Sequence, residues 1–398
     1  MTDNASKRRA LQRLVRIAPA VRGLLAEATG DQDVPYRPVI LKSLTSDEAI
    51  HFANSAGKSG TVSCPAPLAG SRTPPLFLGP VDCAAASEET REQLRDAIGA
   101  YAQQHGAKPE IVCLRDLGAL YAAPSERPAE RSLWNKVALV TGAAGAIGYG
   151  ICRGLLEKGC YVVASDLPGE RLDRLAADLK RISSERVVGV PIDVTDKESV
   201  DRGIEDVNLT WGGIDILVLN AGIAMVAHLK EMELEAFRRL EKVNIEGALL
   251  TLSAIARHFI LQGIGGDIIV ISTKNVPSPG AGFGAYSATK AACHQLGRIA
   301  SIELAAHGVR VNMVAPDGVF SEGQYKSGLW EEVGPDRMRA RGLDEQGLQE
   351  YYRNRNLLKA RITGQHVANA VLFFATRQTP TTGATIPVDG GLPDATPR

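Results

Sequence analysis

The 398-residue sequence lacks several features that would direct a protein to particular partners or compartments. Neither charge is in excess, because 45 lysines and arginines balance 45 aspartates and glutamates, so no general attraction to nucleic acid or to an anionic membrane is expected. No apolar run is long enough to span a bilayer. The N-terminus does not resemble a signal peptide, because Arg13, Arg16 and Arg22 interrupt its apolar stretch.

Paired cysteines and clustered metal ligands are also missing from the sequence. The six cysteines form no Cys-x-x-Cys pair, which fits reduced thiols and predicts a cytoplasmic protein. The first 130 or so residues hold only His51 and His105, far apart and without an acidic companion motif, so we expect no metal site there. The length exceeds one ordinary domain and favours two folded units.

A glycine-rich turn joins a short apolar segment, residues 136–140, to a helical one, residues 149–158. This order of strand, turn and helix points backbone N–H groups and a positive helix end at a pyrophosphate. Small residues also serve ordinary tight turns, so the turn alone would be weak evidence. The residues assigned here to dinucleotide binding are Gly142, Gly145, Ala146, Ile147 and Gly148.

A second apolar segment, residues 161–165, ends at the carboxylate of Asp166. An acid roughly 20 residues beyond the glycines would accept both hydrogen bonds of an adenosine ribose diol and repel a 2′-phosphate. Neither the glycine turn nor Leu167 supplies a lysine or arginine for that phosphate. The sequence therefore predicts NAD rather than NADP.

Tyr286 and Lys290 lie four residues apart in an alanine-rich stretch, residues 285–300, that should be helical. Side chains at this spacing emerge on one face of a helix, and a neighbouring ammonium favours the phenolate form of a tyrosine. The pair could therefore exchange a proton with an alcohol or a carbonyl. A Tyr and a Lys at helical spacing are often only a solvated face, so the pair gains its weight from the other motifs.

With these motifs, residues 133–398 resemble the short-chain dehydrogenase/reductase family. The family uses a tetrad of Asn, Ser, Tyr and Lys, so the resemblance implies catalytic roles for Asn244, Tyr286 and Lys290, with Asn244 holding a water that links Lys290 to solvent. Thr273 stands thirteen residues before Tyr286, where the family has its serine, and would polarise the substrate oxygen. Ser272 is the alternative if the intervening loop differs by one residue.

The resemblance also implies further cofactor contacts. They are Leu167, Asp193, Val194, Asn220, Ala221, Gly222, Pro316, Gly318, Val319 and Ser321, together with Tyr286 and Lys290. Four positions depart from the family pattern: Ala146 and Asp317 replace glycines, Leu219 replaces an asparagine, and Ser321 replaces a threonine.

Strands and helices alternate through this region, which predicts a doubly wound parallel sheet of the Rossmann type with helices on both faces. We expect a small N-terminal α/β domain over residues 1–121, a linker over 122–132, the reductase over 133–398, and a lid at about 320–361. The lid carries aromatic and basic residues that could bind a polar ring or belong to a solvated helix face: Trp330, Tyr351, Tyr352, Arg337, Arg339, Arg341, Arg353 and Arg355.

A closer resemblance connects residues 348–359, Thr273-Lys274-Asn275 and Ala315-Pro316-Asp317-Gly318 to the dehydrogenase half of bifunctional rhamnulose-1-phosphate aldolase/lactaldehyde dehydrogenases. Residues 14–20 and 111–118 resemble fragments of the aldolase half, so the N-terminal domain is interpreted as a non-catalytic remnant without metal ligands. This resemblance favours an oxygen-rich substrate, meaning a sugar, cyclitol or small hydroxyaldehyde. A phosphorylated substrate is the less favoured alternative, because a solvated helix face explains most of the lid arginines equally well.

Three functions fit these motifs. The first is an NAD-dependent dehydrogenase or ketoreductase, with Tyr286 as the acid/base. The second is an epimerase that retains NAD and oxidises and re-reduces one carbon. The third is a non-catalytic, NAD-responsive binding protein, against which the intact Asn244, Tyr286 and Lys290 argue. The family resemblance also implies a homodimer or homotetramer.

Overall fold

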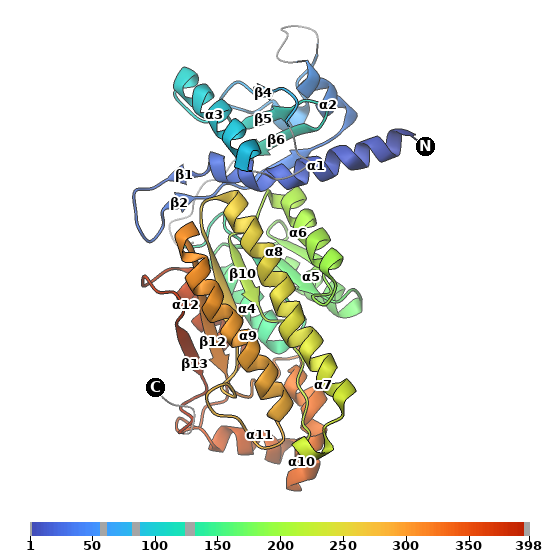
Figure 1. Cartoon of the computed structure of the whole chain (residues 1–398), viewed down its shortest axis with the longest axis vertical. Coiled ribbons are helices and arrows are strands. Elements are labelled where there is room, and N and C mark those ends of the chain that lie inside the picture. Colours follow the sequence, from blue (N-terminus) through green and yellow to red (C-terminus); the bar gives the residue numbers. More distant parts are fainter. Residues whose placement is uncertain (1, 56–61, 82–87, 124–131, 394–398) are drawn as a thin grey trace.

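The computed structural model describes residues 2–55, 62–81, 88–123 and 132–393, which build two units around separate sheets (Figure 1). The N-terminal unit lies at one end of the molecule, and the helices of the C-terminal lid lie at the other end. Among the described helices, none combines the length and apolar character needed to cross a bilayer.

The larger sheet has seven parallel strands in the order β13-β12-β11-β10-β7-β8-β9. Their bounds are β7 Val137–Val140, β8 Tyr161–Asp166, β9 Val187–Pro191, β10 Ile216–Leu219, β11 Gly266–Ile271, β12 Val309–Pro316 and β13 Thr385–Val388. The central strands are short apolar runs buried along their whole length, as parallel strands covered on both faces require. The predicted doubly wound Rossmann-type sheet is confirmed.

Helices cover both faces of this sheet. One face carries α4 (Ala146–Glu157), α5 (Glu170–Ile182) and α12 (Gly364–Ala375); the other carries α6 (Lys197–Trp211), α8 (Gly247–Gln262) and α9 (Gly284–Glu303). Helices α4 and α12 pack so closely that a Cβ on Gly150 would lie 2.4 Å from the carbonyl carbon of Gly364. Small residues at this crossing therefore hold α4, and with it the glycine turn, against the sheet.

The N-terminal unit is built on a four-stranded mixed sheet in the order β3-β6-β5-β4. Its elements are α1 Thr2–Leu25, β1 Glu27–Ala28, β2 Tyr36–Arg37, β3 Leu41–Leu44, α2 Asp47–Asn54, β4 Leu76–Leu78, α3 Glu88–His105, β5 Ile111–Leu114 and β6 Gly118–Ala122. Of the expected linker, Ala122 still belongs to β6, and residues 124–131 lie outside the described part of the chain.

Helix α1 docks the N-terminal unit onto α6 and α8 of the reductase, through a buried arginine. Arg22 is 0% exposed and donates hydrogen bonds to both carboxylate oxygens of Asp215, at 2.9 and 2.8 Å. It also donates to the side-chain oxygen of Gln262 and to the carbonyls of Val39 and Asn135.

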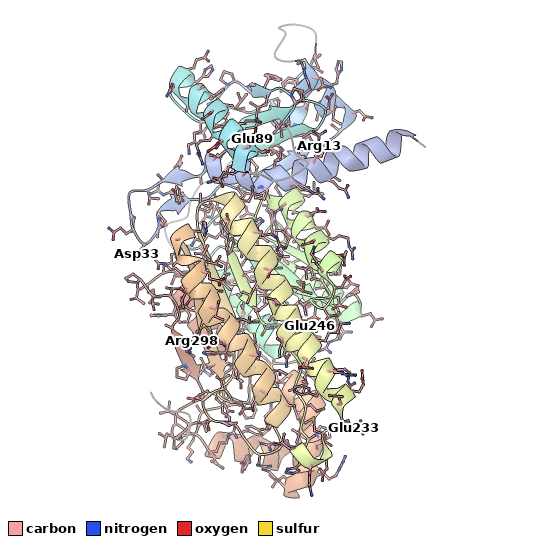
Figure 2. All side chains as sticks on the ribbon, in the orientation of Figure 1. Arg13, Asp33, Glu89, Glu233, Glu246 and Arg298 are labelled. Atoms are coloured by element: carbon pink, nitrogen blue, oxygen red, sulfur yellow. The ribbon has the colours of Figure 1, made fainter. Side chains whose placement is uncertain are left out.

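Asp215 immediately precedes β10, so this contact lies at the amino ends of the strands. A second contact comes from Asp33, which lies in the loop between β1 and β2 and accepts a hydrogen bond from Arg310 at 3.3 Å (Figure 2). The N-terminal unit thus covers the sheet edge opposite to the carboxyl ends, where ligands bind in open α/β sheets.

Candidate active site

A pocket of about 590 Å³ opens at the carboxyl ends of the parallel strands. Its walls come from the segments that follow β7, β8, β9, β10, β11 and β12, and from the lid. It is lined by all predicted cofactor residues except Ser321, and by Thr273, Tyr286 and Lys290 of the predicted tetrad. Residues separated by more than 140 positions in the sequence therefore meet in one cavity.

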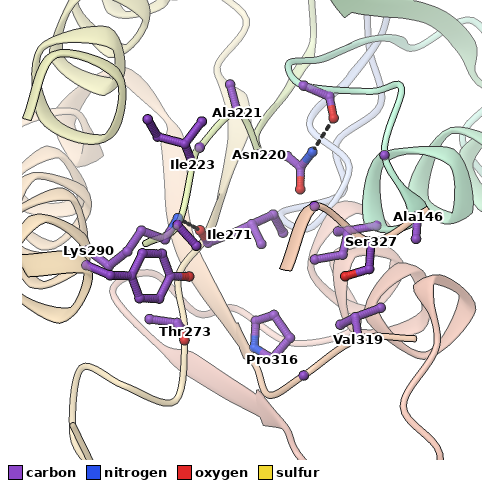
Figure 3. A pocket seen from close by; sticks show the side chains of 18 of the residues that line it. Ala146, Asn220, Ala221, Ile223, Ile271, Thr273, Lys290, Pro316, Val319 and Ser327 are labelled. Atoms are coloured by element: carbon purple, nitrogen blue, oxygen red, sulfur yellow. Dashed lines mark hydrogen bonds between the residues drawn. The ribbon is translucent and has the colours of Figure 1, made fainter. Parts of the chain in front are cut away.

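The glycine turn has a shape that larger residues would block. Gly142 has a φ of +60°, and a Cβ added there would lie 2.7 Å from the Cα of Ala221. Asn220 stabilises the turn, because its side-chain amide donates hydrogen bonds to the carbonyls of Thr141 and Gly142 at 3.0 and 2.7 Å. Figure 3 shows Asn220 with one of these bonds. Gly145 caps α4, whose first turn faces the pocket and would hold a pyrophosphate on its N–H groups.

The carboxylate of Asp166 lines the pocket at the end of β8. Its two oxygens accept hydrogen bonds from the backbone N–H groups of Ala144 and Leu167, both at 2.8 Å, so the side chain is fixed beside the glycine turn. Each oxygen keeps a lone pair for a ribose hydroxyl. The sequence reasoning missed Arg171, which also lines the pocket and pairs with Glu331 at 3.6 Å.

Helix α9 brings Tyr286 and Lys290 to the same pocket wall. The Lys290 ammonium is buried and donates to the carbonyl of Ile271 at 2.7 Å, which fixes it beneath the end of β11 (Figure 3). Thr273 lies in the same part of the pocket. An ammonium held in this place can stabilise negative charge on a neighbouring oxygen.

The two candidate hydroxyls at the end of β11 have different partners. The Ser272 hydroxyl is 2.9 Å from Nδ1 of His294, whose pKa is lowered by burial and by the charge of Arg298. The Thr273 hydroxyl accepts a 3.3 Å hydrogen bond from the N–H of Asn275, which leaves its proton available to a ligand. Both residues line the pocket, and the role of Thr273 as donor to substrate stays a prediction.

Asn244 lies behind the pocket wall, in a π-helical turn, Lys242–Glu246, that joins α7 (Leu234–Glu241) to α8. It is 2% exposed, and its amide bonds both backbone polar groups of Ile223 and the hydroxyl of Thr289 on α9. These bonds hold the segment after β10 against α9. The water-holding role that the family resemblance implies for Asn244 stays a prediction.

The start of the lid differs from expectation at two residues. The Ser321 hydroxyl accepts a hydrogen bond from the N–H of Ser327 at 3.0 Å, and Ser327 rather than Ser321 lines the pocket. Trp330, which the sequence offered as a possible contact for a polar ring, packs inside the lid against Phe320 and Tyr352 and donates to the carbonyl of Val319. Other lid side chains, among them Ser327 and Arg337, line the pocket instead.

The lid contains α10 (Gly334–Arg341) and α11 (Glu345–Asn354). Of its five arginines considered from the sequence, three line the pocket and two are exposed outside it: Arg337, Arg341 and Arg355 line it, and Arg339 and Arg353 do not. Arg337 is buried and Arg355 is half-buried, so a solvated helix face does not account for these two.

Comparison with known proteins identifies the family of this chain. Residues 136–332 match the family model for short chain dehydrogenases. Sorbitol dehydrogenase of Cereibacter sphaeroides is 35% identical over 187 residues, which are 47% of this chain and 72% of that protein. Among solved structures, sorbitol-6-phosphate 2-dehydrogenase from Erwinia amylovora matches with a TM-score of 0.59 and 30% identity, covering 64% of this chain and 98% of that one.

The chain belongs to the short-chain dehydrogenase family, whose members are oxidoreductases that generally use NAD or NADP. A further relative is an uncharacterized oxidoreductase of Bacillus subtilis, YuxG, which is 34% identical over 273 residues. That match covers 68% of this chain and only 39% of the relative, so YuxG extends well beyond the shared region.

Proposed function

We propose that this protein is an NAD(H)-dependent oxidoreductase that interconverts a hydroxyl and a carbonyl group on a polar, carbohydrate-like substrate such as a sugar, cyclitol or hydroxyaldehyde. The observation that carries the proposal is the convergence of Thr273, Tyr286 and Lys290 on the pocket that the glycine turn and Asp166 also line. Sorbitol dehydrogenase and sorbitol-6-phosphate 2-dehydrogenase among the similar proteins support a polyol-like substrate.

Each of the three residues Thr273, Tyr286 and Lys290 has its own role in the proposed reaction. NAD, when bound, supplies the carbon that takes up the hydride released as the substrate C–H bond breaks. Tyr286 removes the proton of the substrate hydroxyl, and Thr273 donates a hydrogen bond to the same oxygen. Lys290, held by the carbonyl of Ile271, stabilises the phenolate form of Tyr286, which becomes a neutral phenol when it takes up this proton. The reverse reaction returns hydride and proton to the carbonyl.

The preference for NAD rests on Asp166. Its carboxylate is fixed beside the glycine turn, where it would accept hydrogen bonds from a ribose diol and repel a phosphate at the same place. Arg171, a cation near this end of the pocket, already faces Glu331.

The direct test is to follow NADH formation on purified protein with NAD or NADP and a panel of sugars, cyclitols, hydroxyaldehydes and plain alcohols. We expect turnover of hydroxylated substrates that is lost in Tyr286→Phe and in Thr273→Ala. Ser272→Ala serves as the matched hydroxyl deletion and should retain activity. Turnover restricted to plain hydrophobic alcohols would contradict the substrate class. If no NADH forms although NAD is bound to the protein, the epimerase or the non-catalytic binding protein becomes the better hypothesis.

We also propose that the N-terminal unit is a non-catalytic remnant of an aldolase domain. It docks at the sheet edge opposite the pocket, and YuxG extends beyond the matched region, as a bifunctional relative would. Incubation with rhamnulose 1-phosphate and zinc should give no aldol cleavage; cleavage lost on chelation would refute this view.

We further propose a homodimer or homotetramer. Large apolar side chains are exposed on the neighbouring helices α8 and α9, namely Leu249, Ile260, Ile299 and Ile302. A second copy of the chain would cover them. Light scattering should give two or four chain masses, and a monomer at micromolar concentration would refute the proposal. A cytoplasmic location is proposed because the five cysteines within the described residues are all free thiols.

A further inference from the structure

The lid side of the pocket carries an excess of positive charge. Lys274 follows Thr273, and Arg337, Arg341 and Arg355 come from the lid; all four line the pocket. The carboxylate that lines this side with them is Asp317. The other acids of the lining are Asp166, Asp193 and Glu331: Asp166 and Asp193 follow β8 and β9 at the nucleotide end, and the lid residue Glu331 pairs with Arg171 at 3.6 Å. Four cations therefore face one anion at the substrate end.

Two of these cations already have hydrogen-bond partners near the lid, one of them an anion. Arg355 forms a charge-paired contact with Asp317, including a 3.1 Å bond from its Nε, and its guanidinium lies 4.3 Å from the ring centre of Tyr352. Arg341 donates to the hydroxyl of Tyr351 at 3.1 Å and lies over the same ring. These two arginines are positioned by the lid itself.

Arg337 is different, because its charge has no counterpart in the described structure. The residue is 8% exposed, and its Nε is buried without a hydrogen-bond partner among the described residues. Its guanidinium lies 4.6 Å from the ring centre of Phe283, three residues before Tyr286. A buried cation without an anion is costly, and a ligand that supplies the anion relieves that cost.

Lys274 and Asn275 extend the same arrangement. The Lys274 ammonium donates to the carbonyl of Ser278 at 3.2 Å and has two protons left for a ligand. Burial, and then the charge of Arg355, lower the pKa of Lys274, as expected for an ammonium that lacks sufficient negative charge nearby. The side-chain oxygen of Asn275 is buried without a partner among the described residues and can accept from a substrate hydroxyl.

We propose that the substrate carries a negatively charged group, a phosphate ester or a carboxylate, and that Arg337 and Lys274 bind this group. The inference rests on the proposed function and narrows its substrate class to acidic polyols or sugars. The planar guanidinium of Arg337 can bond two oxygens of such a group, while Lys274 acts as a point charge. A neutral polyol would leave the charge of Arg337 unpaired.

The first experiment compares a neutral hexitol, its terminal phosphate ester and the corresponding aldonic acid as substrates with NAD. We expect kcat/KM to favour one of the anionic compounds by about 10- to 100-fold, mainly through KM, which corresponds to one or two charge-assisted hydrogen bonds. The preferred compound distinguishes phosphate from carboxylate. Arg337→Gln should reduce the ratio of anionic to neutral kcat/KM toward unity.

The matched control is Arg339→Gln on the same helix. Arg339 is exposed, pairs with Asp336 and does not line the pocket, so this variant should retain the wild-type ratio. Equal use of neutral and anionic substrates, with no change in Arg337→Gln, would overturn the inference and leave the proposed oxidoreductase intact. If no compound of any kind reduces NAD, the proposed function fails instead.

Measuring the binding of small anions tests the inference without any need for catalytic turnover. The protein is saturated with NAD, which occupies the pyrophosphate site, and is then titrated calorimetrically with inorganic phosphate and, separately, with acetate. Binding of either anion that is weakened about 10-fold or more in Arg337→Gln and Lys274→Gln, but not in Arg339→Gln, supports the inference. No binding, or binding that all variants share, overturns it.

Discussion

Replacing Arg22 by Met tests how the two units of this protein are joined. Arg22 uses its guanidinium in five hydrogen bonds, two of them to Asp215 and the others to Gln262, Val39 and Asn135. Both side chains of the ion pair are almost completely buried. Met has a similar length and apolar stem, so the substitution removes the charge and the donors while it preserves most of the packing.

The expected cost follows from what remains after the substitution. Asp215 would keep two hydrogen bonds, from the N–H of Val137 at 2.7 Å and from the side-chain amide of Gln262 at 3.5 Å, but it would be a buried carboxylate without its arginine partner. Breaking a buried ion pair from one side costs about 3–5 kcal/mol. Arg16 provides the control, because it lies on the same helix and pairs with Glu205 at 3.6 Å while 49% exposed. Arg16→Met should cost less than about 1 kcal/mol.

The assay is urea unfolding followed by tryptophan fluorescence, since Trp211 is buried at the end of α6, against which α1 packs. Asp215→Asn in the Arg22→Met background should recover part of the lost free energy, because it removes the unpaired charge. The reasoning is refuted if Arg22→Met costs no more than Arg16→Met, or if Asp215→Asn only adds to the loss.

Three further predictions concern other parts of the molecule. Burial, then the charge of Arg22, lower the pKa of His258 from 6.5 to about 4, so the unfolded chain binds one proton more in this range. Unfolding free energy should therefore fall by about 2 kcal/mol from pH 6.5 to about pH 5, and His258→Gln should remove this slope in urea titrations. Gly142→Ala should lower the free energy of unfolding by about 1–3 kcal/mol, because Gly142 has a positive φ and lies close to Ala221. The control, Gly145→Ala, should lower it by less than about 1 kcal/mol, because the added Cβ would lie no closer than 3.8 Å to any neighbour. Equal midpoints of the two variants in thermal melts would contradict this prediction. Asp166→Ser should weaken NAD about 10-fold and improve NADP relative to NAD in fluorescence titrations, and an unchanged NAD affinity would show that the carboxylate does not touch the ribose.

The parallel sheet and much of the pocket could be predicted from the sequence because their signals are local. The glycine turn, Asp166 and the Tyr286–Lys290 pair each lie within a few residues of a strand or on one helix face, and strand ends in this fold meet at one edge. Ser321 and Trp330 were harder to place. Their surroundings depend on how the lid folds back on itself, through Ser327 and Tyr352, which no short motif reports.

The N-terminal unit illustrates a second limit of the sequence. In the sequence, Arg22 is recognisable only as one of the charges that interrupt an apolar stretch. In the structure it is a fully buried residue of the domain interface. Its partners, Asp215 and Gln262, lie about 190 and 240 positions away in the chain. An ion pair between residues so far apart in the chain produces no local sequence pattern, so it could not be predicted from the sequence.

The sequence by itself determined the sheet and the nucleotide end of the pocket, because these follow from backbone propensities and short-range spacing. For the lid arginines the sequence left open whether they contact a ligand or form a solvated helix face, and the structure places Arg337 and Arg341 four residues apart on one face of α10, with Arg339 off that face. Only the tertiary structure decided that this face turns toward the pocket, because helical periodicity defines a face without specifying what it packs against. The charge of the substrate is inferred from that orientation.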